Sequence, residues 1–154
     1  RMVKIPTVTL DTDLTEGQCF GCGANNPAGL RLKFSKDDDG VRATYRPNPL
    51  FQGWPGLLHG GITGTLLDEA MSHAAYTTGN TCLTAESTLR IRQPIPLDTE
   101  LIVTARISRT RRKVIETEGM VSLPDGTVLA ESTAKQFIVE NTAGDVVREK
   151  KHHV

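Results

Sequence analysis

The stretch that decides the fold is Gly53-Trp-Pro-Gly-Leu-Leu-His-Gly-Gly-Ile-Thr-Gly-Thr-Leu-Leu-Asp-Glu-Ala-Met71. It begins as a loop rich in glycine and proline and becomes an apolar run that extends to Tyr76. Apolar residues between Ile62 and Ala74 recur with helical spacing, and Gly79-Asn80 follows as a stop signal. The sequence therefore predicts one helix of about five turns over residues 60–77.

Alternating polar and apolar residues predict strands on both sides of this helix. Before it, two short strands flank an Asp-rich turn and predict a hairpin, and after it four strands with short connections predict an antiparallel meander. One apolar helix facing one antiparallel sheet predicts an α+β fold in which the sheet wraps around a long central helix, the hotdog arrangement. The predicted strands are Leu30–Lys36, Val41–Tyr45, Cys82–Arg92, Leu101–Ile107, Val114–Leu123 and Thr127–Glu140.

Length and composition narrow the class of protein. The 154 residues carry 18 basic and 18 acidic side chains, a balance that argues against a nucleic-acid partner. No segment approaches the about 20 apolar residues of a membrane span, and residues 1–10 lack the apolar core of a signal peptide. We therefore expect a cytoplasmic protein without a membrane partner. It would consist of an N-terminal arm (1–18), one domain (19–140) and a C-terminal tail (141–154).

Three cysteines, an odd number, do not suggest a disulfide framework. Cys19 and Cys22 have the spacing of half a zinc site, but a structural site needs four ligands, and the only further candidates are Cys82 and scattered histidines. A redox dithiol would normally precede a helix directly. We therefore favour a loop with two reduced thiols and expect no metal, while the role of the pair stays open.

The start of the predicted helix suits the binding of a substrate oxygen, because Gly60 and Gly61 leave backbone N–H groups accessible there. Asp68 and Glu69 lie further along, on opposite sides of the apolar stripe. Either acid can also be an ordinary solvated or paired residue, and Glu69 can pair with His73. Asp68 lies about 12 Å along the axis from Gly60, too far for one substrate bond. If both Gly60 and Asp68 take part in the reaction, the second of them comes from another copy of the chain.

Three segments together resemble the hotdog-fold acyl-CoA thioesterases of the PaaI-like subgroup: Phe51–Met71, the loop Cys19–Leu30 and the strand region Leu83–Leu97. The resemblance covers residues 19–140 and keeps the elements in the same order. It implies hydrolysis of an acyl-CoA to a free acid and CoA by a homodimer or homotetramer. It implies no cofactor, since coenzyme A is part of the substrate.

The resemblance also implies roles for individual residues. The backbone N–H of Gly60, helped by Gly61, would polarise the thioester carbonyl. Asp68 of the partner subunit would act as general base on water or as nucleophile. Thr84 would orient the water or the acid, and His59 would shape the loop.

Substrate contacts are expected around these residues. Ser87 offers a second hydroxyl on the same strand. Some relatives carry an amide upstream of the His, and here Gln52 and Asn48 are the only polar amides nearby. Met71 is expected to line or border the acyl pocket, together with Leu67, Tyr76 and Leu58, and Trp54 is expected to shape the loop. Arg90 and Arg111, from the basic concentration near the predicted hairpin 109–113, would contact the CoA phosphates, unless that region is only a solvated turn.

Two rival functions remain open from the sequence. A non-catalytic acyl-CoA-binding hotdog protein would keep the glycines but would not need Asp68. A hotdog hydratase or dehydratase acting on acyl thioesters would centre on a catalytic histidine with an acid at other spacings.

Overall fold

The computed structural model describes residues 17–139. The predicted tail, and the predicted arm up to residue 16, lie outside the described residues. In chain order the elements are β1 (Ser35–Asp37), β2 (Gly40–Tyr45), a short 3-10 helix (Pro49–Phe51), α1 (Gly60–Tyr76), β3 (Cys82–Ile91), β4 (Leu101–Arg111), β5 (Val114–Ser122) and β6 (Val128–Ile138).

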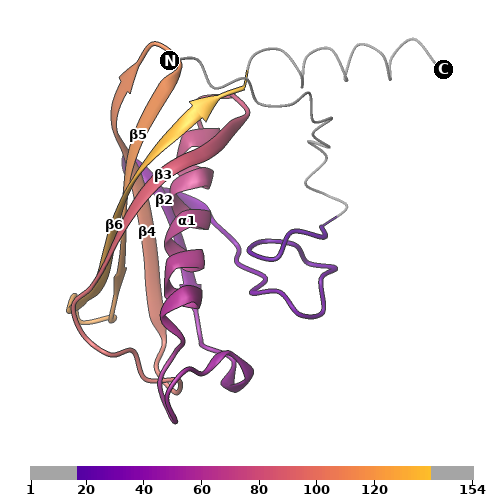
Figure 1. The fold of residues 1–154 in the computed structure, drawn as a ribbon, viewed down its shortest axis with the longest axis vertical. Helices are drawn as coiled ribbons and strands as arrows, with labels where there is room; N and C mark the ends of the chain where they lie inside the picture. Colours follow the sequence, from indigo (N-terminus) through magenta and orange to yellow (C-terminus); the bar gives the residue numbers. More distant parts are fainter. Residues whose placement is uncertain (1–16, 140–154) are drawn as a thin grey trace, which may run out of the picture.

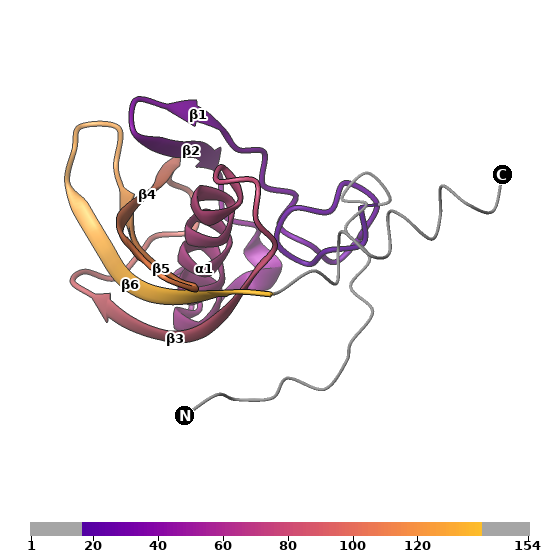
Figure 2. The ribbon, with the colours of Figure 1, turned by 90° about the horizontal axis from the view of Figure 1, so that it is seen from above.

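The predicted hotdog fold is confirmed. A six-stranded antiparallel sheet curves around the single long helix, which lies against its concave face (Figures 1 and 2). The predicted helix, the β1–β2 hairpin and the β4–β5 hairpin all form. No helix of the described residues is long and apolar enough to cross a membrane.

The position of β3 differs from the predicted meander. The strand order is β1-β2-β4-β5-β6-β3, so β3 pairs with β6 at the far edge and not with β4, the next strand in the chain. The connection after β3 explains the difference, because it pairs with the loop before the helix: Leu58 N–H donates to Ile95 O over 2.8 Å, and Leu97 N–H donates to Gly56 O over 3.1 Å. The chain thus crosses the helix start before β4 begins.

The first predicted strand is also shorter than expected. β1 covers only Ser35–Asp37, although Leu30 and Leu32 alternate with polar residues as a strand would. Both leucines are buried, but their N–H groups donate to Phe20 O (2.8 Å) and Gly21 O (2.9 Å). They pair with the N-terminal loop instead of β2, and in this way they hold that loop beside the helix.

The helix is fixed to the sheet by a close-packed apolar face. Leu66, Leu67 and Met71 are fully buried, and burial of each such side chain stabilises the fold by about 1.5–3 kcal/mol. β5 has Gly119 beneath this face, where a Cβ would lie 3.2 Å from both Leu67 Cδ2 and Met71 Cγ. The absent side chain lets the helix approach the sheet closely, which fixes where the rest of α1 presents its side chains.

Candidate functional site

The start of α1 presents a free backbone donor. His59 is the N-cap, and its Nδ1 accepts the N–H of Gly61 over 2.9 Å. The next two N–H groups, of Ile62 and Thr63, donate to the carbonyl of His59. Among the described residues no group accepts the N–H of Gly60. Of the two predicted donors, Gly60 is therefore available to a ligand, while the N–H of Gly61 is used by the cap.

A cavity of about 550 Å³ opens beside this donor. Its walls are mostly apolar and come from the loop before the helix and from the end of β3; they include Trp54, Leu57, Leu58, Ile91 and Ile95. Trp54 lines the cavity and is 81% exposed. The start of the helix, with the N–H of Gly60, thus faces a mostly apolar cavity.

Asp68 lies on the face of α1 that meets β3. Its Oδ1 accepts a hydrogen bond of 2.8 Å from Thr84 Oγ1, so the structure brings together this predicted pair. The register of β3 against β6 shifts between Thr84 and Glu86, a bulge of the kind that re-aims a side chain. Asp68 does not line the cavity at Gly60, and the two predicted catalytic ends are separate surfaces of one chain.

Gln136 on β6 completes this polar group and was missed by the sequence analysis. It pairs with Thr84 across the strands, is fully buried, and has its amide 3.1 Å from Thr84 Oγ1. A hydroxyl has one hydrogen, and Thr84 donates it to Asp68, so the Gln136 amide must donate to Thr84 Oγ1. Exchanging the O and N positions of the Gln136 amide places Nε2 at this contact and gives it the partner that it otherwise lacks. Its signal in the sequence is a large amide among the inward positions of an alternating strand.

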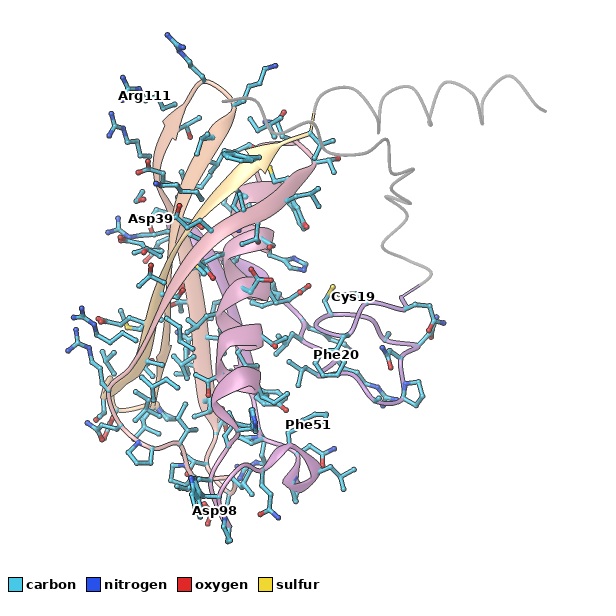
Figure 3. The ribbon with its side chains drawn as sticks, viewed as in Figure 1. Cys19, Phe20, Asp39, Phe51, Asp98 and Arg111 are labelled. Atoms are coloured by element: carbon cyan, nitrogen blue, oxygen red, sulfur yellow. The ribbon has the colours of Figure 1, made fainter. Side chains whose placement is uncertain are left out.

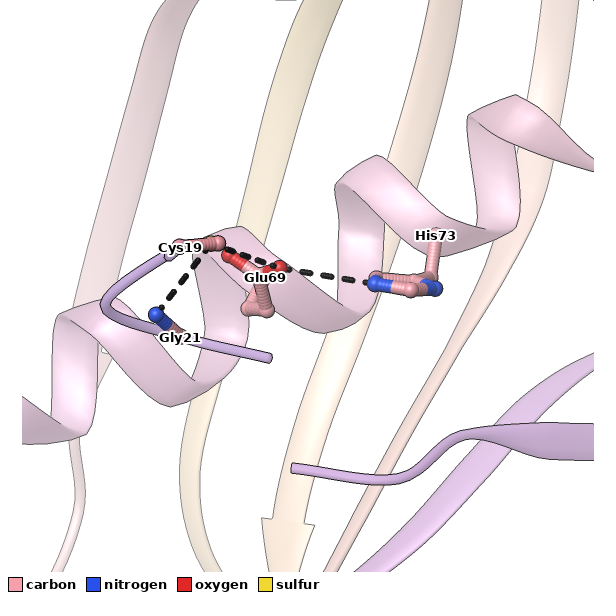
Figure 4. A network of polar contacts seen from close by, with 4 residues as sticks. All are labelled: Cys19, Gly21, Glu69 and His73. Carbon is pink, nitrogen blue, oxygen red and sulfur yellow. Dashed lines mark hydrogen bonds and ion pairs between the residues drawn. The ribbon is translucent and has the colours of Figure 1, made fainter. Parts of the chain in front are cut away.

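Glu69 points to the opposite side of the helix, towards the N-terminal loop. Its Oε1 lies 3.6 Å from Cys19 Sγ and 3.4 Å from His73 Nε2, the helical neighbour with which pairing was expected (Figure 4). Burial alone would raise the pKa of Glu69, but contacts with His73 and Cys22 outweigh it and leave the pKa below its ordinary value. Burial and the Glu69 carboxylate raise the pKa of the Cys22 thiol well above its usual range.

The remaining predicted substrate contacts are scattered. Ser87 is exposed on β3, and Gln52 is exposed in the loop, where its Oε1 accepts the N–H of Gly56 over 3.3 Å. Met71, expected to line the acyl pocket, is fully buried against Gly119 and has no surface to offer a ligand in this structure. Leu67 is likewise fully buried, whereas Leu58 borders the cavity at Gly60.

The two predicted arginines are not brought together with the helix start. Arg111 lies at the end of the β4–β5 hairpin, opposite the end of the molecule where Asp98 lies (Figure 3). Arg90 lines a different cavity of about 600 Å³ on the sheet, whose walls include the acidic Asp39 and Glu118. Both carboxylates are ion-paired with Arg106 in the same cavity. Arg90 therefore lies among charges of both signs, on a surface apart from Gly60.

Comparisons with known proteins show which proteins the chain resembles. The family model of the thioesterase superfamily matches residues 55–130. Acyl-coenzyme A thioesterase THEM4 of Bos taurus is 27% identical over 131 residues, which are 83% of this chain and 54% of that protein. The chain thus spans about half the length of this curated relative.

Solved structures give the same result for the fold. A thioesterase superfamily protein superposes with a TM-score of 0.75 at 26% identity, covering 88% of this chain and 70% of that one. A Bacillus halodurans protein solved with CoA superposes with a TM-score of 0.61 at 28% identity, covering 71% and 72%.

Proposed function

Because the chain has the hotdog fold and matches the thioesterase superfamily model over residues 55–130, we propose that it hydrolyses an acyl-CoA thioester to a free acid and CoA. The observation that carries the proposal is that one chain holds both groups that the reaction needs. A free N–H at Gly60 faces an apolar cavity, and Thr84 orients the carboxylate of Asp68 elsewhere on the helix. The names of the relatives, an acyl-coenzyme A thioesterase and a protein solved with CoA, support CoA as the thiol part of the substrate.

In the proposed reaction the thioester carbonyl oxygen accepts the N–H of Gly60 at the positive end of the helix dipole. As general base, Asp68 takes a proton from water while the water oxygen bonds to the carbonyl carbon, and the C–S bond then breaks as that proton passes to the CoA sulfur. As nucleophile, Asp68 bonds to the carbonyl carbon itself, the C–S bond breaks to give an acyl anhydride and the CoA thiolate, and water then hydrolyses the anhydride to the free acid while its proton passes to the thiolate. Thr84, held by Gln136, keeps one carboxylate oxygen occupied, so that the other faces the substrate.

Each site would combine two chains. Gly60 and Asp68 are separated by about 12 Å along one helix, so a single thioester cannot contact both in one chain. β3 is an edge strand with Leu89 40% and Ile91 45% exposed, and such an edge is open to pairing with a second copy. A homodimer paired through β3 would place Asp68 of the partner subunit near Gly60; a cytoplasmic location and a homotetramer stay predictions.

A thiol-release assay tests the proposed function. We expect purified protein to release free thiol and acid in equal amounts from at least one member of a panel of short, long and aromatic acyl-CoAs. Binding of acyl-CoA with no thiol release from any of them would favour the non-catalytic binding protein. Addition of water to an enoyl-CoA without thiol release would favour the hydratase.

Thr84 offers a test of the acid's orientation. Thr84→Val removes the hydroxyl and keeps the shape, so we expect kcat to fall by about 10- to 100-fold, the worth of one hydrogen bond to a charged group. Thr84→Ser should keep most of the activity, and Gln136→Leu should fall between the two. Thr110→Val, exposed on β4 and away from the β3 edge, is the control. Equal activity of the valine variants at 84 and 110 would remove Thr84 from the mechanism.

A further inference from the structure

A second group of reactive side chains lies on the side of α1 that the proposed reaction does not use. The loop that carries Cys19 and Phe20 covers the helix on the side away from the sheet (Figure 3). There the ligand atoms of Cys19, Cys22 and Glu69 all lie within 4.8 Å of one another. The sequence offers only a Cys-x-x-Cys pair, and the fold supplies the third ligand from 50 positions further along the chain.

The distances fit a shared cation. Tetrahedral zinc, with Zn–S and Zn–O bonds of about 2.3 and 2.0 Å, places sulfur and oxygen ligands about 3.5 Å apart. Cys19 Sγ and Glu69 Oε1 are 3.6 Å apart. Two thiolates select a borderline-soft ion such as Zn²⁺ over Mg²⁺ or Ca²⁺.

The loop is shaped to hold the thiols against the carboxylate. Gly21 N–H donates to Cys19 Sγ over 3.3 Å, a bond that stabilises a thiolate, and Gly23 N–H donates to Cys19 O over 2.9 Å. A Cβ on Gly21 would overlap the Glu69 carboxylate, and a Cβ on Gly23 would overlap the loop backbone. Glycine at both positions therefore permits the close approach of loop and helix.

His73 supports the carboxylate from the other side (Figure 4). Its ring stacks on Phe34 at 4.6 Å and lies 5.7 Å from Tyr76, which fixes its orientation. Its Nε2 lies 3.4 Å from Glu69 Oε1, within ion-pair distance of the carboxylate. Such a partner orients a metal-binding carboxylate without touching the ion, and its loss typically costs 10- to 100-fold in affinity.

We propose that Cys19, Cys22 and Glu69 bind one Zn²⁺ ion per chain, with His73 orienting Glu69 and a fourth position open to water. The ion fastens the N-terminal loop to α1. This proposal departs from the expectation of no metal and does not depend on the thioesterase proposal, because Asp68 lies on the other side of the helix.

Metal analysis of the purified full chain tests this site. We expect about one zinc per chain from zinc-supplemented growth, and a near-ultraviolet thiolate-to-metal charge-transfer band after exchange for Co²⁺. That band reports sulfur ligands, so histidines elsewhere in the chain do not produce it. Cys19→Ser, Cys22→Ser and Glu69→Gln should lose the ion, and His73→Ala should bind it about 10- to 100-fold more weakly. Cys82→Ser, which removes a buried thiol of β3 outside the cluster, should keep it.

Titration of wild-type protein keeps the test independent of variant folding. Zn²⁺ should raise the Tm of metal-depleted wild type and of Cys82→Ser, but not of Cys22→Ser. Wild-type protein that neither retains zinc nor gains Tm on its addition would overturn the proposal. So would one free thiol in place of three in the metal-free protein under non-reducing conditions, since that count indicates a Cys19–Cys22 disulfide and a redox pair.

Discussion

Asp68→Asn is expected to lower kcat for acyl-CoA hydrolysis by about 10²- to 10⁴-fold, the usual contribution of a positioned general base. Asparagine has the shape of aspartate and still accepts the hydrogen bond that Thr84 donates over 2.8 Å. It cannot take a proton from water or attack a carbonyl as a carboxylate does. Substrate Kd should therefore change little, and kcat from thiol release with Kd from calorimetry separates the two effects.

Asp98→Asn is the matched control, because Asp98 is an exposed aspartate in the connection before β4. Full activity of Asp68→Asn would exclude Asp68 from the reaction. Glu69→Gln carries the same chemical change one residue further along, on the side that meets the N-terminal loop. A loss of turnover in Glu69→Gln at unchanged Tm, combined with wild-type turnover in Asp68→Asn, would move the catalytic acid to Glu69.

Gly60→Pro is expected to lower kcat by about 10²- to 10³-fold, the cost of removing one oxyanion-hole donor. Proline deletes the N–H, and Gly60 is the first residue of α1, where proline is well tolerated. The preceding residue, His59, already has the extended backbone (φ −61°, ψ 133°) that a following proline requires. The N–H of Gly61 cannot substitute, because it is donated to His59.

Gly60→Ala separates the N–H from the side chain. It adds a Cβ 3.3 Å from Ile91 Cδ1, the mobile end of a flexible side chain, and keeps the donor. We expect Gly60→Ala to retain most of its turnover, and the thermal midpoints of both variants should lie close to that of wild type. Equal turnover of the proline and alanine variants would show that the N–H of Gly60 does not bind the transition state.

The parts of the fold that local patterns encode were predicted from the sequence. α1 was predicted nearly to its ends because its apolar periodicity and its glycine stop signal act over neighbouring residues. The pairing of Asp68 with Thr84 was implied by the resemblance, and the structure places these two side chains in contact.

Features that depend on long-range pairing escaped the sequence analysis. The place of β3 follows from how the connection at Ile95 crosses the helix start, and Leu30 alternates like a strand residue although it pairs with Phe20. Gln136 gains its importance only through its register with Thr84. The thiols of the N-terminal loop meet Glu69 for the same reason, since no local spacing joins residues so far apart in the chain.

We propose that each site takes Gly60 from one chain and Asp68 from the other. Mixing two inactive variants, Gly60→Pro and Asp68→Asn, under conditions that exchange subunits tests it directly. A mixed dimer has one site with both intact groups, so random exchange should restore about a quarter of wild-type turnover per chain. Turnover of the mixture that stays at the level of the separate variants, with mixed dimers verified by mass, would contradict the two-chain site.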